Sequence, residues 1–129
     1  MKDTLDSYDP YKPPHPAVWL SLDETERLSL VVDYHRGEPG GFESIHAHAA
    51  IHAVVETQVA MADETPVAQT LDRLQQEGLD RHDAVHAIGS VLAGRIYDLL
   101  GNRIPSGNVN KEYWVALERL TADTWRRAR

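Results

Sequence analysis

The chain contains no cysteine, and this absence excludes several kinds of stabilisation and chemistry. Disulfide bonds, thiolate metal ligands and cysteine nucleophiles all need the missing thiol. Long hydrophobic runs are absent as well, because no apolar stretch approaches the ~18 residues that a membrane-spanning helix needs. The polar start from Met1 to Thr4 lacks the pattern of a signal peptide. We therefore expect a bacterial-type cytoplasmic protein with no membrane partner.

Positive charge is scarce: 13 Lys and Arg residues face 20 Asp and Glu residues, which gives a formal net charge of −7. Proteins that bind nucleic acid usually present a basic surface to the phosphates, so we expect no nucleic-acid partner. The remaining composition, 42% hydrophobic and 26% charged in 129 residues, is typical of one globular domain with one core.

Proline is concentrated at the start of the chain, where four of its seven residues fall among the first 16. Proline fixes φ and removes a backbone donor, so residues 1–20 are predicted to form an extended arm. Tyr8 and Trp19 indicate that this arm lies on the body of the protein or on a second subunit. A four-helix core over 21–101 and a C-terminal helix over 110–127 complete the single predicted domain.

Local signals predict where the core helices begin. Ser21 and Glu24 form a capping box, Thr65 and Pro66 make a helix start, and Asp80 is an N-cap. The expected core helices cover residues 22–36, 45–62, 66–77 and 81–100. No segment shows the alternation of a β-strand, so the predicted fold is an all-α up-down bundle. Short turns between its four main helices predict that the second and the fourth run parallel.

The C-terminal helix is expected to be continuous and to pack on the core with one face. That inward face is predicted to contain Trp114, Leu117, Leu120, Thr121 and Trp125.

Histidine is abundant, and four of the seven histidines form two pairs with HxxxH spacing. On the second expected helix, His48 and His52 fall in the apolar stripe at about 100° per residue, whereas His46 turns outward. On the fourth expected helix, His82 falls in the apolar stripe and His86 at its edge. Polar side chains on a buried face need partners, and the two pairs are natural partners for each other.

A pair of histidines at i and i+4 presents both rings to one point, which suits one metal ion. Neutral imidazoles bind zinc, iron, nickel or copper in preference to calcium or magnesium. With the second and fourth helices parallel, both pairs and His35 are expected in one layer of the bundle. We therefore predict a divalent transition-metal site. Its predicted ligands are His48, His52, His82 and His86, with His35 and Glu56 as additional candidates.

Three other interpretations are open at the level of the sequence. The first is a non-enzymatic structural or interaction protein, a homodimer through the arm and the C-terminal helix, whose buried histidines are hydrogen-bonded. The second is a metal-dependent hydrolase, because three histidines and an open coordination position can activate water. The third is a metal-free site in which His82 or His86 acts as the base and Asp83 or Glu56 orients it. None of these patterns assigns a substrate.

Several segments resemble a family of small uncharacterised bacterial proteins, a domain of unknown function. They are Trp19–Glu24, Tyr34-His35, His48–His52 with Glu56 and Gln58, and Asp80–Gly89, and the resemblance covers roughly residues 8–101. It implies an α-helical protein and assigns no reaction. In its general pattern the chain is also similar to metal-binding helical bundles of the damage-inducible hydrolase and transferase type, which combine one histidine with an HxxxH pair.

Overall fold

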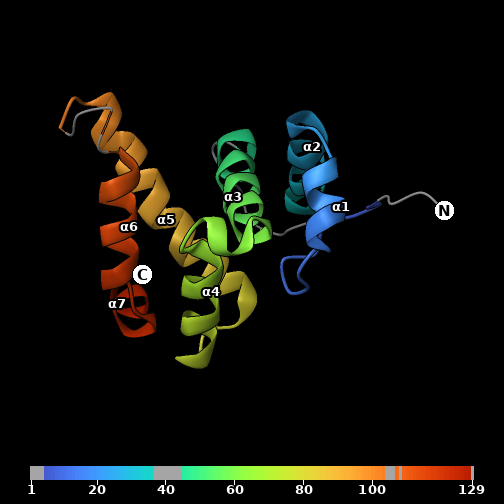
Figure 1. Ribbon diagram of the computed structural model, residues 1–129. Coiled ribbons are helices and arrows are strands. Elements are labelled where there is room, and N and C mark those ends of the chain that lie inside the picture. The colour runs from blue at the N-terminus through green and yellow to red at the C-terminus, as the bar shows by residue number, and fades with distance from the viewer. Residues whose placement is uncertain (1–4, 37–44, 104–106, 108, 129) are drawn as a thin grey trace.

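The computed structural model describes residues 5–36, 45–103, 107 and 109–128, and all regular structure in these residues is helical (Figure 1). The all-α prediction is therefore confirmed. The elements are α1 (Pro16–Ser21), α2 (Glu24–Arg36), α3 (Ile45–Ala60), the short 3-10 helix η1 (Ala62–Glu64), α4 (Val67–Gln76), α5 (Arg81–Leu100), α6 (Val109–Arg119) and α7 (Ala122–Ala128). Within the described residues, no helix is long and apolar enough to cross a membrane.

Helix α3 lies between two apolar clusters and contributes to both. One cluster joins it to the arm, α1 and α2, and includes Tyr8, Trp19, Val31 and Ala49. The other joins it to α4, α5, α6 and α7 through residues such as Val55. In Figure 1, α1 and α2 accordingly lie on one side of α3, and α6 and α7 lie at the opposite end of the molecule.

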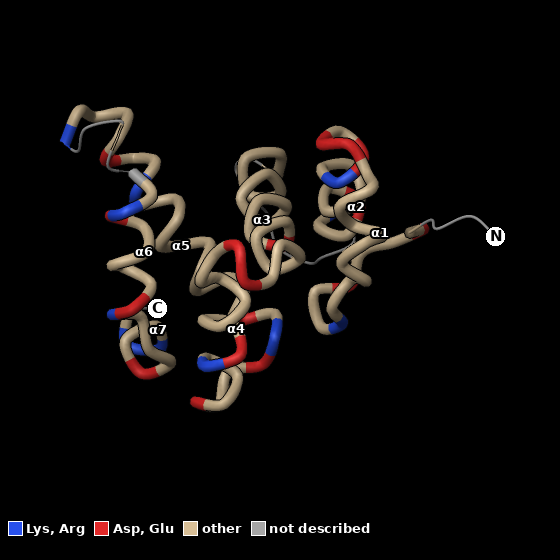
Figure 2. The backbone as a smooth tube through the Cα atoms, in the orientation of Figure 1, with Lys and Arg blue, Asp and Glu red and all other residues tan. Residues whose placement is uncertain are grey.

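This position explains the composition of α3, which is rich in Ala, Ile and Val and contains a single charged residue of the Asp, Glu, Lys and Arg types, Glu56. A helix that is apolar on most sides is typically buried on most sides. In Figure 2 the tube of α3 is almost entirely tan, whereas acidic and basic segments mark the ends of α2 and the turns around α4.

Helices α3 and α5 run antiparallel, and the prediction that they are parallel is wrong. Arg81 at the start of α5 pairs with Glu56 in the second half of α3, while His86 lies beside the earlier His48. Further along, a Cβ at Gly89 would lie 3.0 Å from Cγ2 of Ile51, so the helices approach closely there. The prediction assumes that the chain reverses its direction fully at each turn between helices. The chain instead leaves α3 through η1, with Ala62 at a φ of 54°.

The start of α2 is capped two residues later than predicted. The Asp23 carboxylate accepts a hydrogen bond from the Glu26 amide at 2.7 Å, and the Glu26 carboxylate accepts one from the Asp23 amide at 3.1 Å. This reciprocal pair is a capping box. Ser21 instead donates its hydroxyl to the carbonyl of Val18 at 2.6 Å. It belongs to α1, which starts at Pro16 because proline suits the first helical position. The extended part of the arm is therefore shorter than 1–20.

The start of α5 agrees with the sequence, whereas α4 starts at Val67 with Pro66 as its N-cap, one residue later than predicted. Asp80 accepts a hydrogen bond from the Asp83 amide at 2.7 Å and is the N-cap of α5. Thr65 accepts one from the Val67 amide at 3.2 Å at the start of α4.

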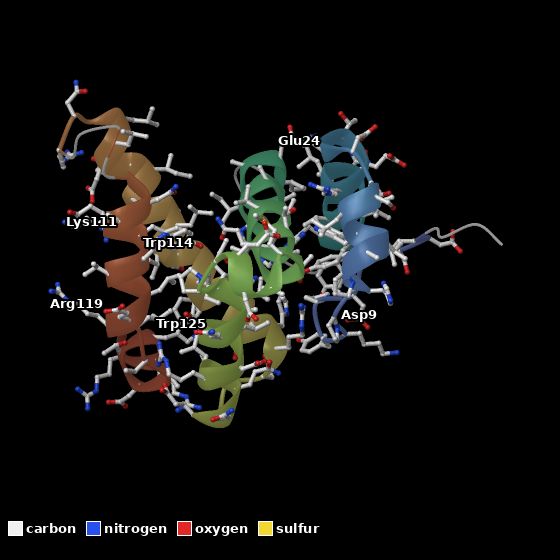
Figure 3. All side chains as sticks on the ribbon, viewed as in Figure 1. Asp9, Glu24, Lys111, Trp114, Arg119 and Trp125 are labelled. Atoms are coloured by element: carbon white, nitrogen blue, oxygen red, sulfur yellow. The ribbon has the colours of Figure 1, made fainter. Side chains whose placement is uncertain are left out.

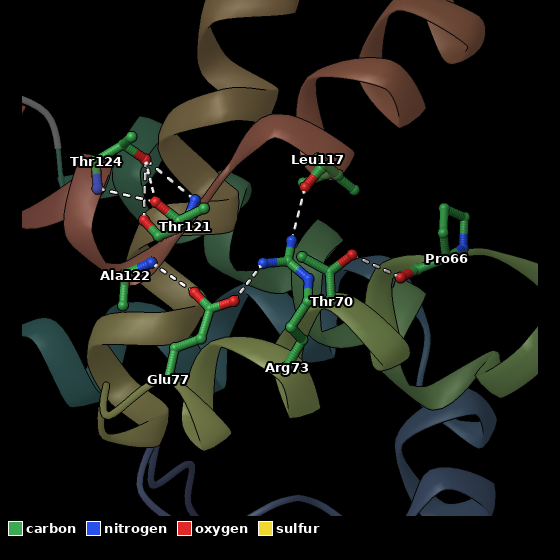
Figure 4. Close-up of polar contacts among 8 residues, drawn as sticks. All are labelled: Pro66, Thr70, Arg73, Glu77, Leu117, Thr121, Ala122 and Thr124. Atoms are coloured by element: carbon green, nitrogen blue, oxygen red, sulfur yellow. Dashed lines mark hydrogen bonds and ion pairs between the residues drawn. The ribbon is translucent and has the colours of Figure 1, made fainter.

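The predicted C-terminal helix is broken into α6 and α7. Thr121 and Thr124 exchange backbone-to-hydroxyl hydrogen bonds at 3.0 Å, which caps α7 (Figure 4). Glu77 accepts a hydrogen bond from the Ala122 amide at 2.9 Å and is held by Arg73, which also donates to the Leu117 carbonyl. The Ala122 and Arg73 hydrogen bonds lower the pKa of Glu77.

Only part of the predicted inward face of this region is fully buried. Leu117 is buried, and so is Tyr113, which the prediction omitted. Trp114, Leu120 and Trp125 are partly buried against the same apolar cluster. Figure 3 shows Trp114 and Trp125 on the inner side of α6 and α7, whereas Lys111 and Arg119 project outward.

A buried ion pair fixes α3 to α5 and holds the arm against both. Arg81 donates to the two carboxylate oxygens of Glu56 at 2.7 and 2.8 Å, and both side chains are at most 5% exposed. The hydroxyl of Tyr8 donates to the same carboxylate at 2.5 Å. Arg81 also donates to the carbonyl of Pro10 at 2.9 Å. Burial and the neighbouring Glu56 raise the pKa of Tyr8, so its hydroxyl keeps the proton that it donates.

We expect Arg81→Leu to lower the free energy of unfolding by about 3–5 kcal/mol, because the carboxylate of Glu56 stays buried without its ion partner. Denaturant titration in the presence of a chelator measures this loss without any contribution from bound metal. The matched control is Arg36→Leu, whose side chain is 64% exposed and lies 3.8 Å from Asp33. For the control we expect a change below about 0.5 kcal/mol. A loss below about 1 kcal/mol for Arg81→Leu would contradict the importance of this pair.

Candidate metal centre

Five of the seven histidines gather where α2, α3 and α5 meet. His35 comes from the last turn of α2, and His48 and His52 come from the first half of α3. His82 and His86 come from the first two turns of α5. The antiparallel packing brings the pairs together because residues 48–56 of α3 lie opposite the start of α5.

Four of these rings are close enough to share one ion. His35, His48, His52 and His86 each offer a ring nitrogen, and these four atoms all lie within 4.8 Å of one another. Neighbouring ring centroids in the group are 4.5 to 5.1 Å apart. A metal–nitrogen bond of about 2.0–2.1 Å places tetrahedral ligands about 3.4 Å apart. Small rotations of the side chains are therefore sufficient to close the set around an ion.

His52 is the most informative member of the group. It is only 2% exposed, and neither of its buried ring nitrogens has a hydrogen-bond partner in the described part of the chain. Leaving a buried polar group unsatisfied typically costs about 1–3 kcal/mol. A metal bound to one ring nitrogen would offset part of that cost.

His35 is oriented by its own helix. Its Nδ1 lies 2.7 Å from the carbonyl of Val31, and a carbonyl only accepts, so Nδ1 carries the proton. The lone pair of this ring is then on Nε2. Histidines that bind metals commonly donate their other N–H to a carbonyl in this way, which fixes the tautomer and the ring plane.

The environment keeps the central imidazoles neutral. Burial, followed by the charges of the neighbouring histidines, lowers the pKa of His52 to about 2. Burial and the nearby His35 and His82 also lower the pKa of His48. Neutral imidazole is the form that coordinates a metal.

The remaining predicted residues lie beside the group. His82 is outside the set of four, with its ring 4.6 Å from His86 and 6.1 Å from His52, and its Nδ1 is 3.1 Å from the hydroxyl of Tyr11. Its assignment as a direct ligand stays a prediction. Glu56 lies one helical turn beyond His52, but its carboxylate is engaged by Arg81 and Tyr8, and its role as a ligand also stays a prediction. His35, predicted as an additional candidate, is a full member of the set.

Sequence reasoning missed the residues that surround the group. Tyr34 sits edge-on to His35 and to His82, at 5.2 and 5.9 Å between ring centroids. Tyr11 stacks edge-on against His82 at 5.1 Å. Arg81 could have been found by asking which cation compensates Glu56 on a mostly apolar helix, because it is the only positively charged residue in α5 before Arg95 other than histidine. Tyr8 and Tyr11 carry no comparable signal, since their partners lie 48 and 71 positions away.

The metal-free protein should lose stability as the pH falls. The unfolded state binds a proton at His52 near the ordinary pKa of about 6.5, whereas the folded state does not until about pH 2. Proton binding therefore stabilises the unfolded state relative to the folded state as the pH falls below about 6.5. Between about pH 7.5 and about pH 5.5, His52 alone should reduce the free energy of unfolding by about 1.4 kcal/mol.

Denaturant titrations in chelator at several pH values measure this slope. His52→Gln should remove the part of the pH dependence that is due to His52. His46→Gln, at an exposed position on the same helix, should leave it unchanged. An unchanged slope in His52→Gln would contradict a neutral, buried His52.

No protein-family model, no curated protein and no solved structure matches the chain. The function of the chain must therefore be inferred from the histidine group itself.

Proposed function

We propose that this protein binds one divalent transition-metal ion through His35, His48, His52 and His86. The observation that carries the proposal is His52, a buried imidazole with no hydrogen-bond partner at either nitrogen among the described residues, placed within reach of three other imidazoles. A single ion would bind a nitrogen of every ring in the set.

The donor set limits the choice of ion. Four imidazole nitrogens without a thiolate or a carboxylate suit zinc, iron(II), nickel or copper, whereas calcium and magnesium prefer oxygen ligands. A tetrahedral zinc site needs four ligands and no more. Metals that prefer five or six ligands would keep further positions for small molecules.

The ion would also join parts of the protein that share little else. His35 belongs to α2 on one side of α3, and His86 belongs to α5 on the other side. Because an ion that binds only the folded state stabilises it by mass action, loading should raise the free energy of unfolding. We propose metal binding as the biochemical activity of the chain, and this stabilisation as its first consequence.

A structural protein with hydrogen-bonded histidines is the competing interpretation. The bonds from His35 to the Val31 carbonyl and between His82 and Tyr11 are of the kind that it requires. It gives no partner to His52, which is why metal binding is the better account.

Metal analysis of tag-free protein tests the proposal directly. After loading with zinc, nickel or iron(II) and removal of excess ion, we expect close to one equivalent of metal per chain. His52→Gln and His86→Gln should each weaken binding by more than about 100-fold, because each removes a ligand. His46→Gln is the matched control, since His46 is exposed on the same helix as His52.

The same samples should be followed by thermal unfolding with and without chelator. Metal should raise the midpoint of the wild-type protein and of His46→Gln, but not that of His52→Gln. Uptake below about one-tenth of an equivalent for every ion, with no shift of the midpoint, would exclude the proposal.

A further inference from the structure

The proposed site has an unusual charge balance. All four ring donors are neutral, so a divalent ion would bring its whole charge into the group. His35 and His52 are 3% and 2% exposed, so part of this charge would lie where water cannot reach it. An uncompensated charge in a region of low dielectric is strongly unfavourable.

The nearest buried carboxylate does not compensate this charge. Glu56 follows His52 by one turn of α3, but Arg81 already neutralises it through two hydrogen bonds. Tyr8 donates a third hydrogen bond to the same group. The set of four potential ligands contains no acid, so a small anion from solution is a suitable source of the compensating negative charge.

One histidine beside the set has the features of a donor to such an anion. His82 packs against both His86 and His52, and its buried Nε2 has no hydrogen-bond partner in the described residues. Its other nitrogen lies 3.1 Å from the hydroxyl of Tyr11. When that hydroxyl donates to Nδ1, the proton of His82 resides on Nε2, on the buried side of the ring.

We infer that the metal keeps a replaceable coordination position on the side of His82, and that a small monovalent anion fills it. His82 donates a hydrogen bond from Nε2 to the anion, and Tyr11 holds His82 in the required tautomer. Tyr11 is 55% exposed, so this is the side from which an anion enters. The inference rests on the proposed metal site and adds the class of its exogenous ligand.

The rings around His82 limit the size of the anion. Tyr11, Tyr34 and His86 all lie with their ring centroids within 5.9 Å of that of His82. Hydroxide, azide or one carboxylate oxygen of formate suits such a crowded place, whereas a phosphate group does not. The shared chemistry is a small anion with a single donor atom for the metal.

Cobalt(II) is the probe for the experiment, because its visible absorption changes with the number and type of ligands. The cobalt-loaded full-length protein is titrated with azide, formate and phosphate at constant ionic strength. For the wild-type protein we expect a saturable spectral change with azide and formate, and none with phosphate.

Variants of His82 and Tyr11 test whether the anion binds on the side of His82. His82→Phe keeps a ring but has no donor, and it should bind one cobalt with azide affinity reduced about tenfold, since a charge-assisted hydrogen bond is lost. His82→Gln, which retains an N–H donor, should recover part of that affinity. Tyr11→Phe should give a smaller loss than His82→Phe. Tyr97→Phe is the matched control, because Tyr97 is 65% exposed in the second half of α5.

Each outcome separates this inference from the proposed function. If the wild-type protein binds no cobalt and also none of zinc, nickel and iron(II), the metal site itself is excluded. If cobalt binds but its spectrum does not change with azide or formate, the metal has no replaceable coordination position. Only the inference is then overturned. If His82→Phe loses cobalt while remaining helical by circular dichroism, His82 is a direct ligand and the inference is again overturned.

Discussion

The buried pair between Glu56 and Arg81 is the interaction on which the arrangement of the histidines depends. It fixes one point of contact between α3 and α5, and the helical repeat places the histidines of each helix at set distances from that point. Moving back along α3 by one and two turns from Glu56 reaches His52 and His48. Moving forward along α5 from Arg81 reaches His86 in the second turn. The histidines of α3 and those of α5 therefore follow from the ion pair in opposite chain directions, and their rings meet between the two helices.

The same pair accounts for the course of the arm. A buried guanidinium has five donors to satisfy, and the carboxylate of Glu56 takes only some of them. The carbonyl of Pro10 accepts another, and Tyr8 adds a donor to the Oε2 of Glu56 that also accepts from Arg81. The arm is therefore held by polar contacts at its start, while Trp19 anchors its end by complete burial and by a hydrogen bond to Thr57 at 3.1 Å.

Several local features of this fold could be predicted from the sequence, because they depend on neighbouring residues, although the cap of α2 lies two residues later than predicted. Asp80 caps α5 as its position indicates, and the outward turn of His46 follows from the helical repeat alone. The burial of His52 could be predicted for the same reason. These are properties of one helix and its immediate flanks.

The features that could not be predicted depend on contacts between distant segments. The antiparallel course of α3 and α5 depends on the path of the chain through η1. The number of turns predicted from the sequence does not reveal that path. The break before α7 is supported by Glu77, which accepts from Ala122 across 45 positions. The sequence names His35 as a further candidate in the same layer, but its membership of the group of four follows from the packing of α2 on α3.

The long reach of the arm has a consequence for synthesis on the ribosome. Tyr8 finds its acceptor 48 residues later, and Pro10 finds its donor 71 residues later. Residues 8–10 therefore wait until the start of α5 has left the exit tunnel before all their polar contacts can form. Folding of this protein cannot simply follow the order of translation. Pro10, Pro13 and Pro14 lack a backbone donor and so disfavour helices and strands in this segment while it waits.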